Sequence, residues 1–140
     1  MTEAEVCRLV QEWYEALDRH DPVEKVIPFL ATEGLVMKFP EGTLNGLEDF
    51  RKWYDTVTHR FFDEIHELKS VEVTPTGPGQ ADVRVVVNWQ ATVWDAPSPK
   101  STWLGFDATQ TWSVTTEDGA PRIRTYVVED LAPMPGSASL

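Results

Sequence analysis

The residue best suited to acid–base chemistry, a histidine beside two acidic residues, lies near the middle of the chain. His66 follows Asp63 and Glu64, and a neutral imidazole near a carboxylate can accept or donate a proton near pH 7. The competing interpretation is a histidine at the rim of a pocket whose hydrogen bonds the protein itself satisfies, because one histidine close to acidic residues is a weak signal. His66 is therefore a candidate general acid or base.

Gln110 interrupts an otherwise apolar row. Alternation along residues 104–114 puts one set of side chains on the same face of a strand: Phe106, Ala108, Gln110, Trp112 and Val114. A buried amide costs free energy unless it is hydrogen-bonded, so Gln110 is either a structural tie or a ligand contact. Asp107 is the only acid inside this strand, and the same alternation favours a solvated or interface carboxylate unless a bulge intervenes.

Tyr126 is a candidate phenolic donor on the last predicted strand. It shares one face with Arg124 and Val128, opposite to Thr125 and Val127. The alternation leaves open which of these two faces looks inward.

Length and composition limit the architecture and the partners. With 140 residues, 41% of them hydrophobic, the chain fits one domain, which we place at residues 1–132, before a small, polar tail at 133–140 that we expect to be disordered. The formal charge of −11 argues against nucleic acid and anionic membranes as partners, since each phosphate contact needs a Lys or Arg.

Cysteine and histidine usage bears on location and cofactors. Cys7 is the only cysteine, which excludes an intrachain disulfide and makes a reducing cytoplasm the expected location. The acidic N-terminus has no apolar run of signal or transmembrane length. The histidines, His20, His59 and His66, lack metal-binding spacing, and we expect neither a metal nor an organic cofactor.

The apolar pattern predicts helices first and strands afterwards. Three- and four-residue intervals predict helices at about residues 3–20, 23–30 and 46–61, with a short strand pair at 34–39 and 43–45. Long β-rich runs follow, separated by turn-rich breaks that favour antiparallel pairing, at about 62–73, 81–95, 101–116 and 122–130. Strands of this length curve strongly, and a change of alternation after Leu68 indicates a bulge.

Four segments carry a family resemblance: VQEWYEALDRHD (10–21), NGLEDFRKWY (45–54), QTWSV (110–114) and RIRTY (122–126). Together with the order of elements, they resemble the nuclear transport factor 2-like superfamily, also called SnoaL-like, over residues 3–130. That resemblance implies an α+β cone, in which three N-terminal helices pack on a strongly curved, mostly antiparallel sheet around an internal pocket.

Comparison with the ketosteroid isomerases of this superfamily narrows the chemistry. Trp13 stands in place of their helix-1 tyrosine, Phe39 before Pro40 in place of their general-base aspartate, and Gln110 in place of their protonated aspartate. An indole and an amide still donate hydrogen bonds, but Phe39 cannot act as a base, which argues against steroid-type isomerisation by that scheme. Histidines on the third strand are common in scytalone-dehydratase-like and cyclase-like members, so the resemblance keeps a catalytic His66 open beside the structural interpretation.

The resemblance therefore implies a small, cofactor-independent enzyme, a cyclase, dehydratase or isomerase, that moves protons on a hydrophobic, oxygenated small molecule. The catalytic candidates are His66, Gln110, Tyr126 and Asp107, and the candidate ligand-binding residues are Trp13, Tyr14, Phe39, Trp53 and Trp89. The alternative is a non-catalytic ligand-binding or assembly module with the same cavity. An apolar patch on the outer face of the sheet, formed by Val86, Trp94 and Trp103, predicts a homodimer.

Overall fold

Helices and one curved sheet make up the computed structural model, which describes residues 1–140. The helical elements are α1 (Glu3–Asp18), α2 (Val23–Val26), the 3₁₀ turn η1 (Ile27–Phe29) and α3 (Gly46–Arg60). The strands are β1 (Val36–Phe39), β2 (Gly42–Asn45), β3 (Phe62–Gly77), β4 (Gln80–Val93), β5 (Thr102–Glu117) and β6 (Ala120–Pro133). The α+β class expected from the sequence is confirmed. None of the helices combines the length and apolar character needed to cross a membrane.

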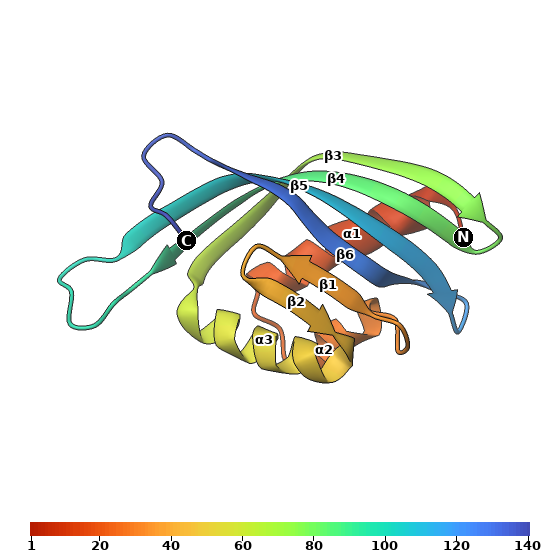
Figure 1. Ribbon diagram of the computed structural model, residues 1–140, viewed down its shortest axis with the longest axis horizontal. Helices are drawn as coiled ribbons and strands as arrows, with labels where there is room; N and C mark the ends of the chain where they lie inside the picture. Colours follow the sequence, from red (N-terminus) through yellow and green to blue (C-terminus); the bar gives the residue numbers. More distant parts are fainter.

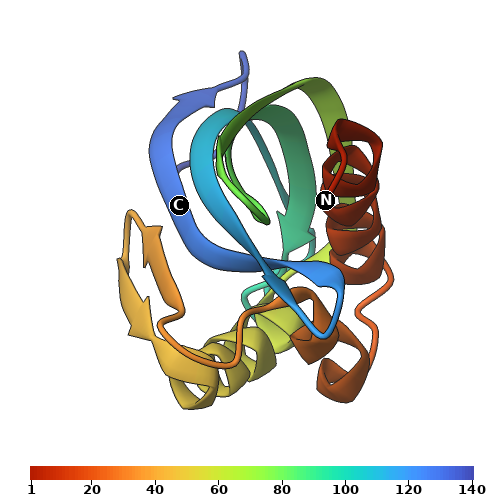
Figure 2. The same ribbon diagram turned by 90° about the vertical axis from the view of Figure 1, so that its right-hand side faces the viewer.

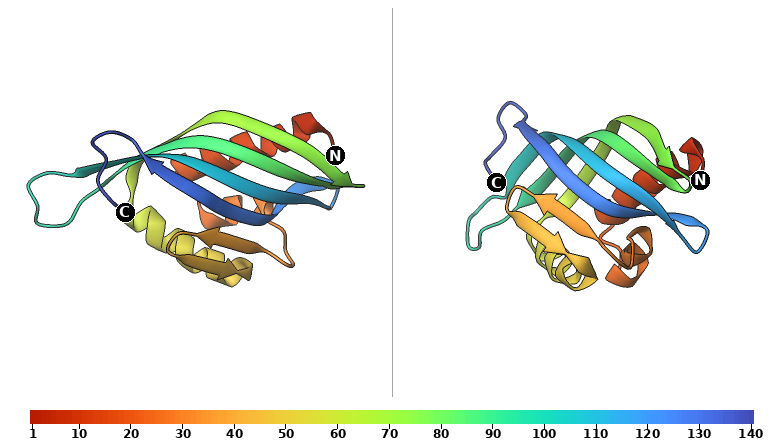
Figure 3. Two further views of the ribbon diagram at one scale, coloured as in Figure 1. Left: turned by 45° about the horizontal axis from the view of Figure 1, so that its top comes forward. Right: turned by 45° about the vertical axis from the view of Figure 1, so that its right-hand side comes forward.

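The sheet wraps around the helices. Its strand order is β2-β1-β6-β5-β4-β3, and every neighbouring pair is antiparallel except β1 and β6. The long strands arch over α1, and α2 and α3 lie below them (Figure 1). Seen along the strands, the sheet curls so that α1 lies beside β3 and α3 lies across the open side (Figure 2). Both oblique views show the same concave face turned toward the helices (Figure 3).

The concave face is closely packed beneath α1. The apolar stripe of α1 recurs with the helical period and is buried at Val6, Leu9, Val10, Trp13 and Leu17. Trp13 meets Trp112 of β5 edge to face, with ring centroids 6.4 Å apart. Both rings are fully buried, so this end of the cone is a filled core.

Bulges decide which side chains the long strands turn inward. The change of alternation expected after Leu68 is confirmed by a register shift between Leu68 and Ser70. A second shift lies in β6, where Ser113 pairs with Thr125 but Val114 pairs with Ile123. The skipped residue there reverses the alternation, so Ile123 and Tyr126 are both buried although they are of opposite parity. The question that the sequence left open for Tyr126 is thereby answered.

The C-terminal residues, which we expected to be disordered, fold back along β5. The Met134 N–H donates to the Gly105 carbonyl at 2.9 Å, and the Ala138 N–H donates to the Trp103 carbonyl at 3.2 Å. The Gly105 N–H donates in turn to the Ser137 hydroxyl at 2.9 Å. These bonds continue the pairing of β6 with β5, so the tail lies along the same edge of β5.

Gly105→Ala should destabilise the protein by about 1–3 kcal/mol, the usual effect of overpacking. A Cβ at this position would lie 2.5 Å from the Trp103 ring and 2.7 Å from the Met134 sulfur. Gly42→Ala is the matched control, because a Cβ there meets nothing within 4 Å. Urea unfolding followed by tryptophan fluorescence measures both variants, and equal stability of the two would contradict the expected close packing.

Candidate functional site

A cavity of about 570 Å³ opens between the concave face of the sheet and α3. Its volume falls within the range of small-molecule pockets, roughly 300–1,000 Å³. Of its 21 lining residues, 13 are hydrophobic, including Phe39, Trp53, Phe61 and Trp89. The cavity is therefore suited to an apolar ligand that a few polar groups orient.

Asp18 and His66 form a bonded pair on one wall of this cavity. Asp18 is the last residue of α1, and its carboxylate accepts two hydrogen bonds from His66 of β3: from ring Nδ1 at 2.5 Å and from the backbone N–H at 2.9 Å. Because a carboxylate only accepts, a proton lies on Nδ1, and in the neutral form of the ring the lone pair is therefore on Nε2. That arrangement orients an imidazole to act as a base.

The His66 ring is also held by aromatic stacking. The Tyr14 ring lies 4.7 Å from it at an interplanar angle of 26°, and the Trp89 ring stacks beyond at 6.4 Å. No protein group hydrogen-bonds Nε2, and the side chain is 11% exposed. Nε2 is thus the one nitrogen of His66 left for a ligand.

Gln110 is oriented by two donors. Its Oε1 accepts the Tyr14 hydroxyl at 2.7 Å and the Trp112 indole N–H at 2.9 Å. Since both partners donate, the oxygen faces them and the amide nitrogen turns away, which leaves two N–H donors. The Tyr126 hydroxyl lies next to this amide, so both groups can donate into the cavity.

Burial governs the ionisation of this cluster. It raises the pKa of Tyr126 above the usual tyrosine value, although the neighbouring Tyr14, Trp13 and Gln110 side chains oppose it. Burial also raises the pKa of Tyr14, and the Tyr126 phenol adds to that rise. Both hydroxyls therefore stay protonated and able to donate at neutral pH.

Glu64 is a carboxylate of the cavity lining. Its side chain is 10% exposed, and its oxygens accept the Trp89 indole N–H at 3.0 Å and bond His20 Nε2 at 2.5 Å. A register shift between Phe62 and Ile65 accompanies its position on β3. Glu64 and His66 alternate inward, so both face the same space.

Comparison with known proteins identifies the family. The model of the SnoaL-like domain matches residues 1–127. The chain belongs to the SnoaL-like domain family. Among curated proteins, no sequence matches it.

Solved structures share the fold of this SnoaL-like domain. A candidate scytalone dehydratase from Novosphingobium aromaticivorans is 14% identical with a TM-score of 0.78, over 97% of this chain and 94% of its own. The hexachlorocyclohexane dehydrochlorinase LinA-type3 from Novosphingobium barchaimii is 13% identical with a TM-score of 0.77, over 98% and 92%. A candidate dehydratase of the NTF2-like family from Streptomyces avermitilis is 16% identical with a TM-score of 0.75, over 94% and 95%.

Most residues singled out from the sequence lie at the cavity of the SnoaL-like domain. The lining includes His66, Gln110, Tyr126, Phe39, Trp53 and Trp89. Tyr14 lies behind this surface, where it supports His66 and Gln110. Two further candidates, Trp13 and Asp107, do not line the cavity. Trp13 is fully buried in the filled end of the core, and Asp107 points to the other face of the sheet, where its carboxylate accepts the Asn88 amide at 2.9 Å.

Sequence reasoning missed the partners of the two acid–base groups. Neither Asp18 nor His20 is among the site residues that the sequence predicts. Glu64 was noted for its nearness to His66, but not as a lining residue with its own histidine. One feature of the sequence points to them. Asp18 and His20 lie at the predicted end of the first helix, within the family segment 10–21 that also contains Trp13 and Tyr14.

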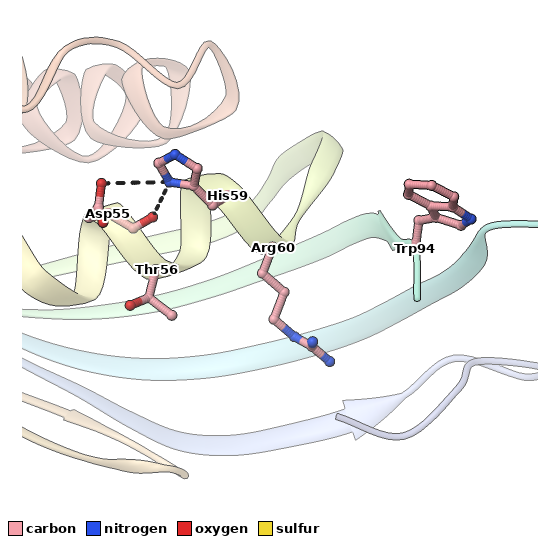
Figure 4. A pocket seen from close by; sticks show the side chains of 5 residues that line it. All are labelled: Asp55, Thr56, His59, Arg60 and Trp94. Carbon is pink, nitrogen blue, oxygen red and sulfur yellow. Dashed lines mark hydrogen bonds and ion pairs between the residues drawn. The ribbon is translucent and has the colours of Figure 1, made fainter. Parts of the chain in front are cut away.

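A second hollow, of about 440 Å³, lies on the surface at the end of α3 (Figure 4). It is lined by Asp55, Thr56, His59, Arg60 and Trp94. His59 is exposed and its Nδ1 contacts the Asp55 backbone carbonyl at 2.7 Å, within the same helix. Thr56 and Arg60 also line the cavity, so this hollow adjoins the entrance. The buried cavity, which collects the oriented polar groups, is the better candidate site.

No cluster of three or more His, Cys, Asp or Glu side chains lies close enough together to hold a metal ion. The polar groups of the site instead form pairs, Asp18 with His66 and Glu64 with His20.

None of the three tyrosines should ionise near pH 10 in the folded protein. Burial, helped by Asp21 and Glu64, raises the pKa of Tyr54 to about 12, and the pKa values of Tyr14 and Tyr126 are raised as well. Because unfolded tyrosines lose protons first as the pH rises, the stability they contribute is complete below pH 10 and declines as the pH approaches 12. Phenolate absorbance should therefore rise together with the loss of native tryptophan fluorescence. An ordinary tyrosine titration that precedes unfolding would contradict this burial.

Proposed function

We propose that this SnoaL-like domain is an enzyme of the dehydratase, cyclase or isomerase type, in which His66 removes a proton from carbon in a hydrophobic, oxygenated small molecule. The observation that supports this most strongly is the Asp18–His66 pair, which leaves one imidazole nitrogen unbonded on a residue that lines an apolar cavity.

Two kinds of group at the cavity support such a step, one that stabilises positive charge and one that stabilises negative charge. As His66 Nε2 takes the proton, the Asp18 carboxylate stabilises the imidazolium that forms. Negative charge then grows on the oxygen conjugated to the reacting carbon, and in this proposal the Gln110 amide and the Tyr126 hydroxyl, which both line the cavity, donate to it. Fixed donors in a water-poor cavity act strongly because the local dielectric is low.

The names of similar structures agree with this class of reaction. Two are described as dehydratases and one as a dehydrochlorinase, and all three names denote eliminations. The alternative is a non-catalytic ligand-binding or assembly module. Its support is the absence of a recognisable carboxylate base, and the Asp18–His66 pair, which offers an imidazole instead, weakens that support.

Asp18→Asn and His66→Gln should each lower proton abstraction by about 10²–10⁴-fold, the usual range for a general base. A suitable probe is nitrobenzisoxazole, in which removal of the C–H proton breaks the N–O bond and releases a coloured phenolate. The rate is followed by phenolate absorbance at neutral pH, and thermal melting by circular dichroism checks that each variant folds.

His59→Gln is the matched control, because His59 lies outside the cavity, and it should keep the wild-type rate. Wild-type protein that is no faster than the two cavity variants would overturn the enzyme proposal. The binding-module alternative would then stand if the protein still binds an apolar dye.

The SnoaL-like domain is also proposed to form a homodimer through the outer face of its sheet, in the cytoplasm. Ile65 supports the dimer, since it points outward from β3 and is 62% exposed. Two residues of the patch expected from the sequence make other contacts. Trp94 lines the hollow beside α3, and the C-terminal tail folds back on Trp103. Light scattering at micromolar concentration should give a dimeric mass, and Ile65→Glu should give a monomer. A monomeric wild type would rule the dimer out.

A further inference from the structure

Glu64 is the one buried carboxylate of the cavity that base catalysis by His66 leaves unused. A charge with 10% exposure is costly unless it is paired, and replacing such a pair with apolar residues is often neutral or stabilising. Its presence in a mostly hydrophobic lining therefore calls for a reason. Its two neighbours, Trp89 and His20, each bond one carboxylate oxygen, so each oxygen keeps a lone pair.

His20 occupies its position at a conformational cost. Its φ is +51°, a left-handed backbone conformation in which glycine is the usual residue after a helix. The Asp21 N–H closes the helix end by donating to the Ala16 carbonyl at 3.1 Å. A glycine would make this turn more easily, whereas histidine alone adds the bond to Glu64.

Exposure increases along the pair from the cavity outward. Glu64 is 10% exposed and lines the cavity, whereas His20 is 26% exposed and does not. The two are joined at 2.5 Å, so a proton can pass from solvent to His20 and on to Glu64. Tyr54 also faces Glu64, but its hydroxyl donates to the Asp21 carbonyl and is already used.

We propose that Glu64 is the general acid of this site, that His20 reloads it with protons from solvent, and that the substrate is an alcohol that loses water. This inference rests on the proposed function of His66. Glu64 and His66 are two residues apart on one face of β3, a separation of about 6.6 Å along the strand. An H–C–C–O fragment with a hydrogen bond at each end spans such a gap.

The step balances in protons and electrons. His66 Nε2 takes the proton from carbon, and the C–H electron pair becomes the new C=C bond. The C–O bond breaks with its electron pair on oxygen, and the Glu64 carboxyl proton goes to that oxygen, so that water leaves. His66 then returns its proton to solvent, and His20 takes one up for Glu64.

Leaving-group dependence tests this role. In a series of benzisoxazoles, the leaving phenols range from acidic, which need no acid catalyst, to weakly acidic, which do. Glu64→Gln keeps the shape of the side chain and an oxygen for Trp89. It should change the rate less than about twofold for nitrobenzisoxazole and lower it about tenfold or more for the unsubstituted compound. His20→Gln should give the same pattern, and the solvent deuterium isotope effect on the unsubstituted compound should fall in both variants.

Asp107→Asn is the matched control, because it removes a carboxylate on the other face of the sheet, and it should leave the whole series unchanged. Loss of rate by one common factor across the series in Glu64→Gln, or no loss at all, would overturn the acid role while leaving His66 as the base. Wild-type protein that fails to accelerate any member of the series would instead overturn the proposed function, and this inference with it.

Discussion

The width of the concave face is the constraint on which the rest of the structure depends. β3 to β6 are each 14 to 16 residues long, and strands of that length curl because they twist. A single helix, α1, covers only part of the resulting hollow. Below α1 the large rings of Trp13 and Trp112 fill the space, but toward α3 the cone widens and about 570 Å³ stays open. The cavity is thus the unfilled end of the core.

Polar groups gather at the boundary between the filled and the open part. Gln110 is tied to Tyr14 and Trp112 on its core side and has its amide nitrogen free on the other. His66 likewise has one nitrogen bound to Asp18 and one free. Each group is anchored in the core with one half and presented to the cavity with the other. Such anchoring fixes orientation before a ligand arrives, and this is the condition for strong electrostatic stabilisation of a transition state.

Features that depend on the helical period or on the alternation of side chains along a strand could be predicted from the sequence. The order of elements, the inward face of β5 with Gln110, and the bulge after Leu68 all follow from such patterns. Tyr126 could not be assigned, because a bulge in β6 reverses the alternation and leaves no mark in the apolar pattern itself.

The missed pairs have a different cause. Asp18 and His66 are 48 positions apart, and His20 and Glu64 are 44 apart. Their contact depends on how the end of α1 docks on β3, a tertiary relation that no local pattern encodes.

The position of Phe39 shows how one cone can support another chemistry. Family comparison places a base there in the ketosteroid isomerases, but here Phe39 stacks on Trp53 with centroids 4.6 Å apart and planes 16° apart. That wall is therefore apolar, and the groups that can move protons lie across the cavity on β3, near the end of α1. For the proposed reaction, Phe39 and Trp53 offer an apolar wall against which a ring of the substrate can be buried. The polar end of such a substrate needs a hydrogen-bond partner, and the polar lining residues His66, Glu64 and Gln110 can supply one.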